Sequence, residues 1–283
     1  MTIVERNHLS SQRKTQAYRP IDFRLRRFCA TRAIFPGTGV SIITRKRRSP
    51  GLLIETEEAH RVLFDCGPGT AQTLEGMGYS ISRLDYIFLT HLHVDHALDY
   101  ATIVNDRAFT TRGSLHVYGP KGLERHTKIL FNELFPDLGS TFRCFDYLSA
   151  KEVDEGLVAD ENGWKVSCAP VKHAGGVCYR MDSFGKSLLY SGDTGPCQSL
   201  TELGREVDLA VMECSFPDPT SLKDEHLYPT LAGSLAAKMK AKKLILTHLY
   251  PECDGREEEM LIEAKRRFTG QVLIAEDGMR IRI

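Results

Sequence analysis

Apolar residues along the chain gather in short runs, and most of these runs end at a turn or at a histidine, aspartate or glutamate. Short apolar runs bounded by Gly or Pro are typical of buried β-strands, whereas apolar residues three and four positions apart indicate helices. The pattern predicts strands over residues 33–35, 40–43, 52–55, 61–65, 86–90, 114–118, 164–170, 176–181, 187–191, 209–212 and 244–247. It predicts helices over residues 71–77, 121–131, 231–240 and 257–267, and another that begins near residue 97.

Five of these strands lead directly into a histidine, aspartate or glutamate, and a sixth ends at Asp65. Where helices connect the strands of a sheet, binding sites form at one end of the strands. Both halves of the chain contribute such residues, so a division near the middle would leave no complete site. We therefore predict an α/β fold with one domain over residues 31–283, in which two sheets pack on each other with helices outside.

The composition is that of a globular protein without a dominant charge: 42% of the residues are hydrophobic, 26% are charged, and the formal net charge is zero. A neutral chain does not point to a nucleic-acid or membrane partner. The eight cysteines are scattered without a Cys-x-x-Cys pair. No apolar run in the sequence approaches the ~20 residues of a membrane helix. These features predict a cytoplasmic enzyme with reduced cysteines.

The first 30 residues are distinguished by seven Arg and Lys residues against only Glu5 and Asp22. Arg-rich segments with few acidic residues occur in organelle-targeting leaders. The favoured interpretation is a weakly ordered N-terminal extension of a bacterial enzyme. A targeting leader is the alternative.

The densest group of metal-ligand side chains is the motif His91-x-His93-x-Asp95-His96, which directly follows an apolar run. Imidazole and carboxylate groups at this spacing suit Zn²⁺, with Mn²⁺ and Fe²⁺ as alternatives. A tight turn after a strand can direct His91 and His93 to one side and Asp95 and His96 to another. This geometry suits two neighbouring metal ions better than one.

Three further candidate ligands, His173, Asp193 and His248, each follow a predicted strand in the second half of the chain. With the first motif they give five imidazoles and two carboxylates. A site that keeps a position for water uses three protein ligands, so six of the seven ligands fill two sites and the seventh, a carboxylate, can bridge them. Two ions ~3.5–4 Å apart that share a hydroxide are suited to hydrolysis, and to phosphoryl groups in particular.

A run of basic residues, Arg45-Lys46-Arg47-Arg48, lies between the predicted strands 40–43 and 52–55. A basic run of this length is usually the solvated tip of a hairpin. Its functional interpretation is a loop that contacts phosphate through Arg45, Arg47 and Arg48. The residues alone leave both interpretations open.

The histidine motif, with Phe64-Asp65-Cys66-Gly67-Pro68-Gly69-Thr70 before it and Ser191-Gly192-Asp193-Thr194 after it, resembles the metallo-β-lactamase superfamily over residues from about 31 to 283. The resemblance implies an αββα four-layer sandwich with a two-metal site. It assigns His91, His93 and His173 to the first metal, Asp95, His96 and His248 to the second, and Asp193 to both. It also implies that Asp65 steadies the metal loop through hydrogen bonds. Asp95 and Asp193 would be indispensable for catalysis, since they set the charge at the metals.

Within the superfamily, the sequence is most similar to the ribonuclease Z branch and its phosphodiesterase relatives. Glu213-Cys214-Ser215-Phe216 resembles that branch's Glu-Ala-Thr-Phe segment, and His226 with Thr230 resembles its His-x-Thr element at a wider spacing. The resemblance implies that His226 and Glu213 assist protonation of the leaving oxygen, which needs a donor that is not a metal ligand. A surface histidine at a helix start is the alternative for His226. The basic run lies where ribonuclease Z carries a Pro-x-Lys-x-Arg-Asn loop.

The sequence departs from ribonuclease Z between His173 and Asp193. That branch inserts a long Gly/Pro-rich arm there, which grips the tRNA, whereas here nineteen residues intervene and their pattern predicts one hairpin. The neutral net charge also disfavours a polyanion, because RNA binding depends on many phosphate contacts.

The sequence therefore predicts a dinuclear-metal phosphodiesterase that acts on a small or short phosphodiester, such as a cyclic nucleotide or a cyclic sugar phosphate. The alternative is an armless ribonuclease Z-like endoribonuclease that processes tRNA 3′ ends. A thioester or lactam hydrolase is less favoured, as is a non-catalytic scaffold, which would be expected to have lost ligands. The branch is commonly dimeric, so a homodimer is compatible with the resemblance.

Overall fold

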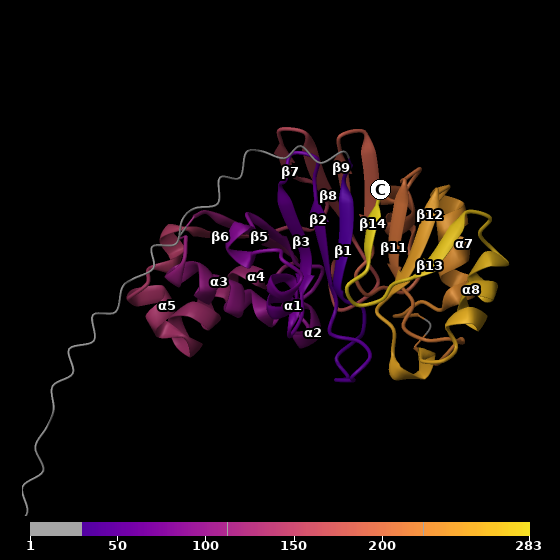
Figure 1. Cartoon of the computed structure of the whole chain (residues 1–283), viewed down its shortest axis with the longest axis horizontal. Coiled ribbons are helices and arrows are strands. Elements are labelled where there is room, and N and C mark those ends of the chain that lie inside the picture. Colours follow the sequence, from indigo (N-terminus) through magenta and orange to yellow (C-terminus); the bar gives the residue numbers. More distant parts are fainter. Residues whose placement is uncertain (1–29, 112, 223) are drawn as a thin grey trace, which may run out of the picture.

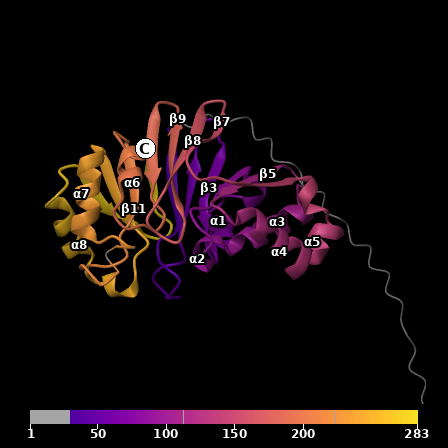
Figure 2. The ribbon, with the colours of Figure 1, turned by 180° about the vertical axis from the view of Figure 1, so that it is seen from behind.

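The computed structural model describes residues 30–111, 113–222 and 224–283. Two sheets lie face to face, and helices cover the outer surface of each (Figures 1 and 2). This arrangement is the αββα four-layer sandwich that the resemblance implied. Of the predicted N-terminal extension, residues 1–29 lie outside the described residues.

Each sheet has seven strands. The first sheet contains, in spatial order, β14 (Arg280–Arg282), β1 (Arg32–Gly37), β2 (Gly51–Glu55), β3 (Arg61–Cys66), β4 (Tyr86–Phe88), β5 (Leu115–Gly119) and β6 (Leu148–Glu152). The second contains β13 (Gln271–Ile274), β12 (Lys243–Thr247), β11 (Leu209–Glu213), β10 (Lys186–Tyr190), β9 (Val177–Ser183), β8 (Trp164–Pro170) and β7 (Gly156–Glu161).

The helices are divided between the two outer layers (Figure 1). Those of the first half are α1 (Thr70–Gly76), α2 (Val94–Ala97), α3 (Asp99–Phe109), α4 (Leu123–Ile129) and α5 (Pro136–Ser140). Those of the second half are α6 (Gln198–Leu203), α7 (Pro229–Met239) and α8 (Glu257–Lys265). Short 3₁₀ turns cover Ile81–Arg83, Cys144–Asp146 and Pro251–Cys253, and a π-helical turn covers Leu130–Leu134.

Successive side chains of a strand point to opposite faces of its sheet. Each sheet can therefore pack against the other sheet on one face and against helices on the other. In β3, Phe64 lies in the apolar core between the sheets, whereas Leu63 packs in the core under the first helical layer. In β11, Val211 faces the other sheet, whereas Met212 packs under the second helical layer. Strands buried on both faces account for the continuous apolar runs of the sequence.

Strand direction brings the candidate ligands to one edge of the second sheet. Strands β10, β11 and β12 run parallel to one another. Strand β9 is antiparallel to both β8 and β10, so β8 has the same direction as β10. The carboxyl ends of β8, β10, β11 and β12 therefore lie together. Strand β11 ends at Glu213, and the ends of the other three precede His173, Asp193 and His248.

The two sheets are joined directly beside the histidine motif. The backbone N–H of Val177 donates to the carbonyl of Thr90 at 2.8 Å, and the Tyr179 hydroxyl donates to the carbonyl of Leu89 at 2.9 Å. Gly192 has φ +56°, and a Cβ at this position would lie 2.5 Å from the Thr90 Cβ. Only glycine fits this contact between the two halves of the chain.

One predicted strand is wrong. Residues 40–43 are irregular, and the backbone between β1 and β2 forms a loop that is closed by a hydrogen bond from the Gly39 N–H to the Arg48 carbonyl. Within this loop the Ile43 side chain is 96% exposed, so its apolar character does not reflect burial. The predicted helices over residues 71–77, 231–240 and 257–267 are confirmed to within two residues at each end.

The hairpin predicted between His173 and Asp193 is also confirmed. It consists of β9 and β10, which are joined by a turn at Phe184 and Gly185. In the parts of the chain that the structure describes, no helix combines the length and apolar character required to cross a bilayer.

Candidate metal centre

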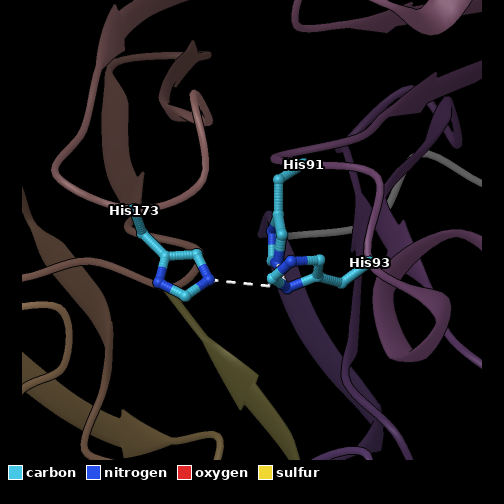
Figure 3. A group of neighbouring side chains, drawn as sticks. All are labelled: His91, His93 and His173. Atoms are coloured by element: carbon cyan, nitrogen blue, oxygen red, sulfur yellow. Dashed lines mark hydrogen bonds between the residues drawn. The ribbon is translucent and has the colours of Figure 1, made fainter. Parts of the chain in front are cut away.

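The structure brings His91, His93 and His173 together from both halves of the chain, as Figure 3 shows. The His91 Nε2 lies 3.0 Å from the His93 Nδ1, and the His173 Nε2 lies 3.5 Å from the same His93 atom. His91 is buried, His173 is half-buried and His93 is exposed. This first group therefore faces solvent on the side of His93.

A second group, Asp95, His96 and His248, lies deeper. The Nε2 atoms of His96 and His248 are 3.2 Å apart, and each lies within 3.7 Å of an Asp95 carboxylate oxygen. All three side chains are buried. His248 directly follows β12 and has φ +57°, an uncommon conformation for a non-glycine residue.

Asp193 lies between the two groups. Its Oδ1 is 3.3 Å from the His96 Nε2 and 3.2 Å from the His248 Nε2, both in the second group. Its Oδ2 is 3.9 Å from the Nε2 atoms of His91 and His173, both in the first group. One carboxylate therefore presents a different oxygen to each set of imidazoles.

Asp65 holds the His96 ring of the second group in position through the nitrogen that faces away from the centre. Its fully buried carboxylate accepts hydrogen bonds from the Thr90 N–H (2.7 Å), the Thr90 hydroxyl (2.9 Å) and the Tyr190 hydroxyl (3.0 Å). It also lies 2.7 Å from the His96 Nδ1. The Nε2 of His96 is thereby directed at the centre, as expected of a metal ligand whose other nitrogen binds a carboxylate.

Ser215 performs a similar role for His248. The Ser215 hydroxyl lies 3.0 Å from the His248 Nδ1 and donates to the Glu213 Oε2 at 2.7 Å. Ser215 stands out in the sequence only within the Glu213-Cys214-Ser215-Phe216 motif, and no pattern singles out Thr90 or Tyr190. Thr90 precedes His91, Tyr190 lies three positions before Asp193 and Ser215 lies two positions after Glu213, so the signal available is proximity to a predicted site residue.

Glu213 and His226 form a buried pair beside the centre. The His226 Nδ1 lies 2.8 Å from the Glu213 Oε1, and Glu213 also accepts from the backbone N–H groups of Thr194 and Leu227. Burial lowers the pKa of His226, but the Glu213 carboxylate outweighs it, and the pKa is raised from its ordinary value. His226 is only 7% exposed, so it is not a surface histidine.

The seven side chains fit divalent cations. Burial and the neighbouring His96 lower the pKa of His91. Burial opposes ionisation of Asp193, but His248 and His96 hold the pKa of that carboxyl well below its usual range. Neutral imidazole and ionised carboxylate are the forms that bind metal. The buried Oδ1 of Asp193 has no hydrogen-bond donor of suitable geometry among the described residues, which leaves it available to a cation.

The basic run lies in the loop between β1 and β2, and its arginines differ. Arg47 is 6% exposed, and its Nη1 donates to the Thr38 hydroxyl and the Ala275 carbonyl. Arg47 thus joins the loop to the fold, and its contact with phosphate stays a prediction. Arg48 forms an ion pair with Asp277, whereas Arg45 is exposed.

Comparison with known proteins agrees with the fold and the site. The family model described as the beta-lactamase superfamily domain matches residues 60–249, which include every candidate ligand. The chain belongs to the metallo-β-lactamase superfamily. It is accordingly a hydrolase of a fold that binds divalent metal.

Two curated relatives place it near the ribonuclease Z branch of that superfamily. It is 28% identical to a ribonuclease Z of Methanosarcina acetivorans, in an alignment that covers 89% of this chain and 98% of the relative. It is 30% identical to a ribonuclease Z of Listeria monocytogenes, which covers 83% of this chain and 94% of the relative. Among solved structures, the metallo-β-lactamase fold protein YhfI of Bacillus subtilis superimposes with a TM-score of 0.76 at 20% identity, over 90% of this chain and all of that chain.

We predict that Asp65→Asn weakens metal binding. The amide preserves the shape of the side chain but loses the charge, and its NH₂ cannot accept from a donor such as Tyr190. Loss of such a supporting hydrogen bond typically costs ~10–100-fold in metal affinity. Competition with a chelator on the purified protein measures the change. Tyr190→Phe, which removes a single donor, should have a smaller effect, and an unchanged affinity in a folded Asp65→Asn protein would contradict the role of Asp65.

Proposed function

We propose that the protein is a phosphodiesterase that holds two divalent metal ions, with Zn²⁺ as the favoured metal. The proposal assigns His91, His93 and His173 to one ion, Asp95, His96 and His248 to the other, and Asp193 to both. The position of Asp193 carries the proposal, because its two oxygens face different sets of histidines. Divalent cations at such a site supply Lewis acidity and a nucleophile at neutral pH.

The ligand residues themselves control the charge of the site. With metal bound, the imidazoles would be neutral and Asp95 and Asp193 would contribute two negative charges, so they would determine how acidic a water in the centre becomes. Asp193 is 5% exposed and Asp95 is 7% exposed, which keeps this charge little screened by solvent. Both carboxylates should therefore be required for activity.

His226 is proposed as the proton donor to the leaving oxygen. Its Nδ1 is held by Glu213, so its Nε2 is the nitrogen left for a substrate. The imidazole lies against the first group, with its ring centroid 4.9 Å from that of His173. A protonated His226 would give its proton to the leaving alkoxide, and Glu213 would orient the ring and stabilise its positive charge.

The compact region between His173 and Asp193 supports a small or short substrate. A tight turn leads from β8 into β9, and the β9–β10 hairpin returns directly to Asp193. The alignment with the Methanosarcina relative spans 306 positions, more than the 283 residues of this chain, so that relative contains segments that this chain lacks. This chain is therefore shorter than that relative over the aligned region.

A ribonuclease Z-like endoribonuclease that processes tRNA 3′ ends is the second candidate. The observation in its favour is that relatives named ribonuclease Z align over 94% and 98% of their own lengths. It requires the same metal centre and the same proton donor, so the two candidates differ in substrate size and not in chemistry.

A comparison of substrates tests the proposal. Metal-loaded protein is assayed in parallel with bis(p-nitrophenyl) phosphate, 2′,3′- and 3′,5′-cyclic nucleotides, and a precursor tRNA. We expect hydrolysis of the small diesters and little cleavage of the tRNA. Cleavage at the tRNA 3′ end with the highest kcat/KM would favour the second candidate. If no diester were hydrolysed by protein that contains metal, the proposal would be wrong.

Metal analysis tests the two-ion assignment. We expect close to two equivalents in wild-type protein that is purified without chelator. His248→Ala removes one of three ligands of the second group, so its content should approach one equivalent. His116→Ala is the matched control, since His116 lies in β5 and its ring stacks on Tyr86 away from the ligands. A His248→Ala protein with the wild-type content would refute the assignment.

His226→Ala should separate proton donation from metal binding. Loss of a proton donor costs typically ~10²–10⁴-fold when the leaving group is poor, and much less when it is already a stable anion. We expect full metal content, a large loss of kcat on a nucleoside or alkyl diester, and a smaller loss on a p-nitrophenyl diester. Glu213→Gln should show a weaker form of the same pattern. Equal losses on both substrates would exclude His226 as the proton donor, and a lower metal content would make it a ligand.

A further inference from the structure

We infer that Phe216 and Tyr250 form a stacking platform for the base of a nucleoside, and that the substrate is therefore a nucleotide diester whose leaving oxygen stays on the nucleoside. This inference rests on the proposed function, since it requires a phosphodiester in the metal centre. The two aromatic residues would select the substrate without taking part in the chemistry.

The two rings form a stacked pair at the edge of the site. Their centroids are 4.8 Å apart and their planes are inclined by 23°. Both side chains are half-buried, so part of each ring is covered and part faces solvent. An aromatic pair of this kind offers an apolar surface on which a further flat ring can stack.

The platform lies beside the proposed proton donor. The His226 ring centroid is 5.9 Å from that of Phe216 and 6.4 Å from that of Tyr250, with both rings nearly perpendicular to the imidazole. The Tyr250 centroid is also 6.4 Å from that of His248. A leaving group that receives a proton from His226 must lie within a few ångströms of the imidazole. The group attached to that oxygen therefore extends along the platform.

Backbone contacts hold the platform in place. Phe216 follows β11 and Tyr250 follows β12, and the Tyr250 N–H donates to the Ser215 carbonyl at 3.2 Å. The Cys214 N–H donates to the Thr247 carbonyl at 2.8 Å, and the Cys253 thiol lies 3.4 Å from the Ser215 carbonyl. A rigid platform loses little conformational entropy when a ligand binds, which makes it suited to recognition.

A second aromatic pair serves as a comparison for the platform, because it is exposed but has a different position. Phe109 of α3 and Phe142 have ring centroids 4.6 Å apart, and Phe109 is 66% exposed. Among the described residues, neither ring stacks against a histidine of the centre. Phe109 therefore provides a matched control for the loss of an exposed aromatic ring.

Nucleobases suit the platform because each has a flat π surface, and stacking on aromatic side chains depends little on the identity of the base. A sugar or alkyl group would gain less from the same rings. The inference therefore specifies a nucleoside but no particular base.

The experiment compares 2′,3′-cyclic AMP with a base-free analogue, methyl riboside 2′,3′-cyclic phosphate, as substrates of the metal-loaded protein. The wild-type protein should prefer the nucleotide by about tenfold or more in kcat/KM, the effect expected of one stacked base. Phe216→Leu and Tyr250→Leu should reduce this preference, mainly through a higher KM for the nucleotide. Tyr250→Phe should retain it, because the ring remains. Phe109→Leu should leave the preference and the activity unchanged.

Calorimetric binding of AMP and of ribose 5-phosphate to the same proteins provides a readout that does not depend on turnover. AMP should bind more tightly to the wild type, and the leucine variants should reduce the difference. If no diester, bis(p-nitrophenyl) phosphate included, were hydrolysed, the proposed function would fail while the binding data would still decide the platform. The inference would be overturned if the wild-type protein had the same kcat/KM for both substrates and the same affinity for both ligands. It would also be overturned if the leucine variants lowered kcat equally for both substrates.

Discussion

The buried carboxylate of Asp65 is the interaction on which the rest of the site depends. It lies at the end of β3 with φ +54°, and its hydrogen-bond partners come from three segments: Thr90 after β4, His96 in α2 and Tyr190 in the second sheet. An ionised group without solvent is costly unless its lone pairs are satisfied. Any displacement of one sheet against the other would break these bonds. Satisfying this one buried carboxylate therefore ties the two sheets together beside the site and directs the His96 imidazole.

The candidate ligands of the centre are packed closely, and a bound cation would satisfy them together. Ring nitrogens approach to 3.0 Å between His91 and His93 and to 3.2 Å between His96 and His248, and the Asp193 carboxylate lies between these pairs. The fold keeps these groups close because each follows a strand whose position is set by apolar packing. Part of the free energy of metal binding consequently offsets the cost of assembling the ligands, which couples metal content to the stability of this edge.

Much of the fold and the ligand set could be predicted from the sequence because the signals are local. His91, His93, Asp95 and His96 lie within six residues, and continuous apolar runs mark the strands that precede the other ligands. Strand β6 was missed, since its Leu-Ser-Ala-Lys-Glu sequence is that of an edge strand with one solvated face. The strand wrongly predicted over residues 40–43 and the unexpected burial of Arg47 have a different cause from the missed strand β6. Strand pairing and the contact of Arg47 with Ala275 both depend on residues far away in the chain.

The candidate ligands and the proposed proton donor lie in different parts of the structure. The candidate ligands lie at strand ends and in the loop that Asp65 fixes, whereas His226 lies with Phe216 on the segment between β11 and α7. Glu213 anchors that segment at both ends, since it accepts from Ser215 and from the Leu227 N–H. The segment can therefore change its exposed side chains without moving the ligands. In the proposed function, this separation would allow a chain that matches ribonuclease Z relatives over nearly their whole length to act on a smaller phosphodiester, because loops that the metal centre does not require would set the substrate size.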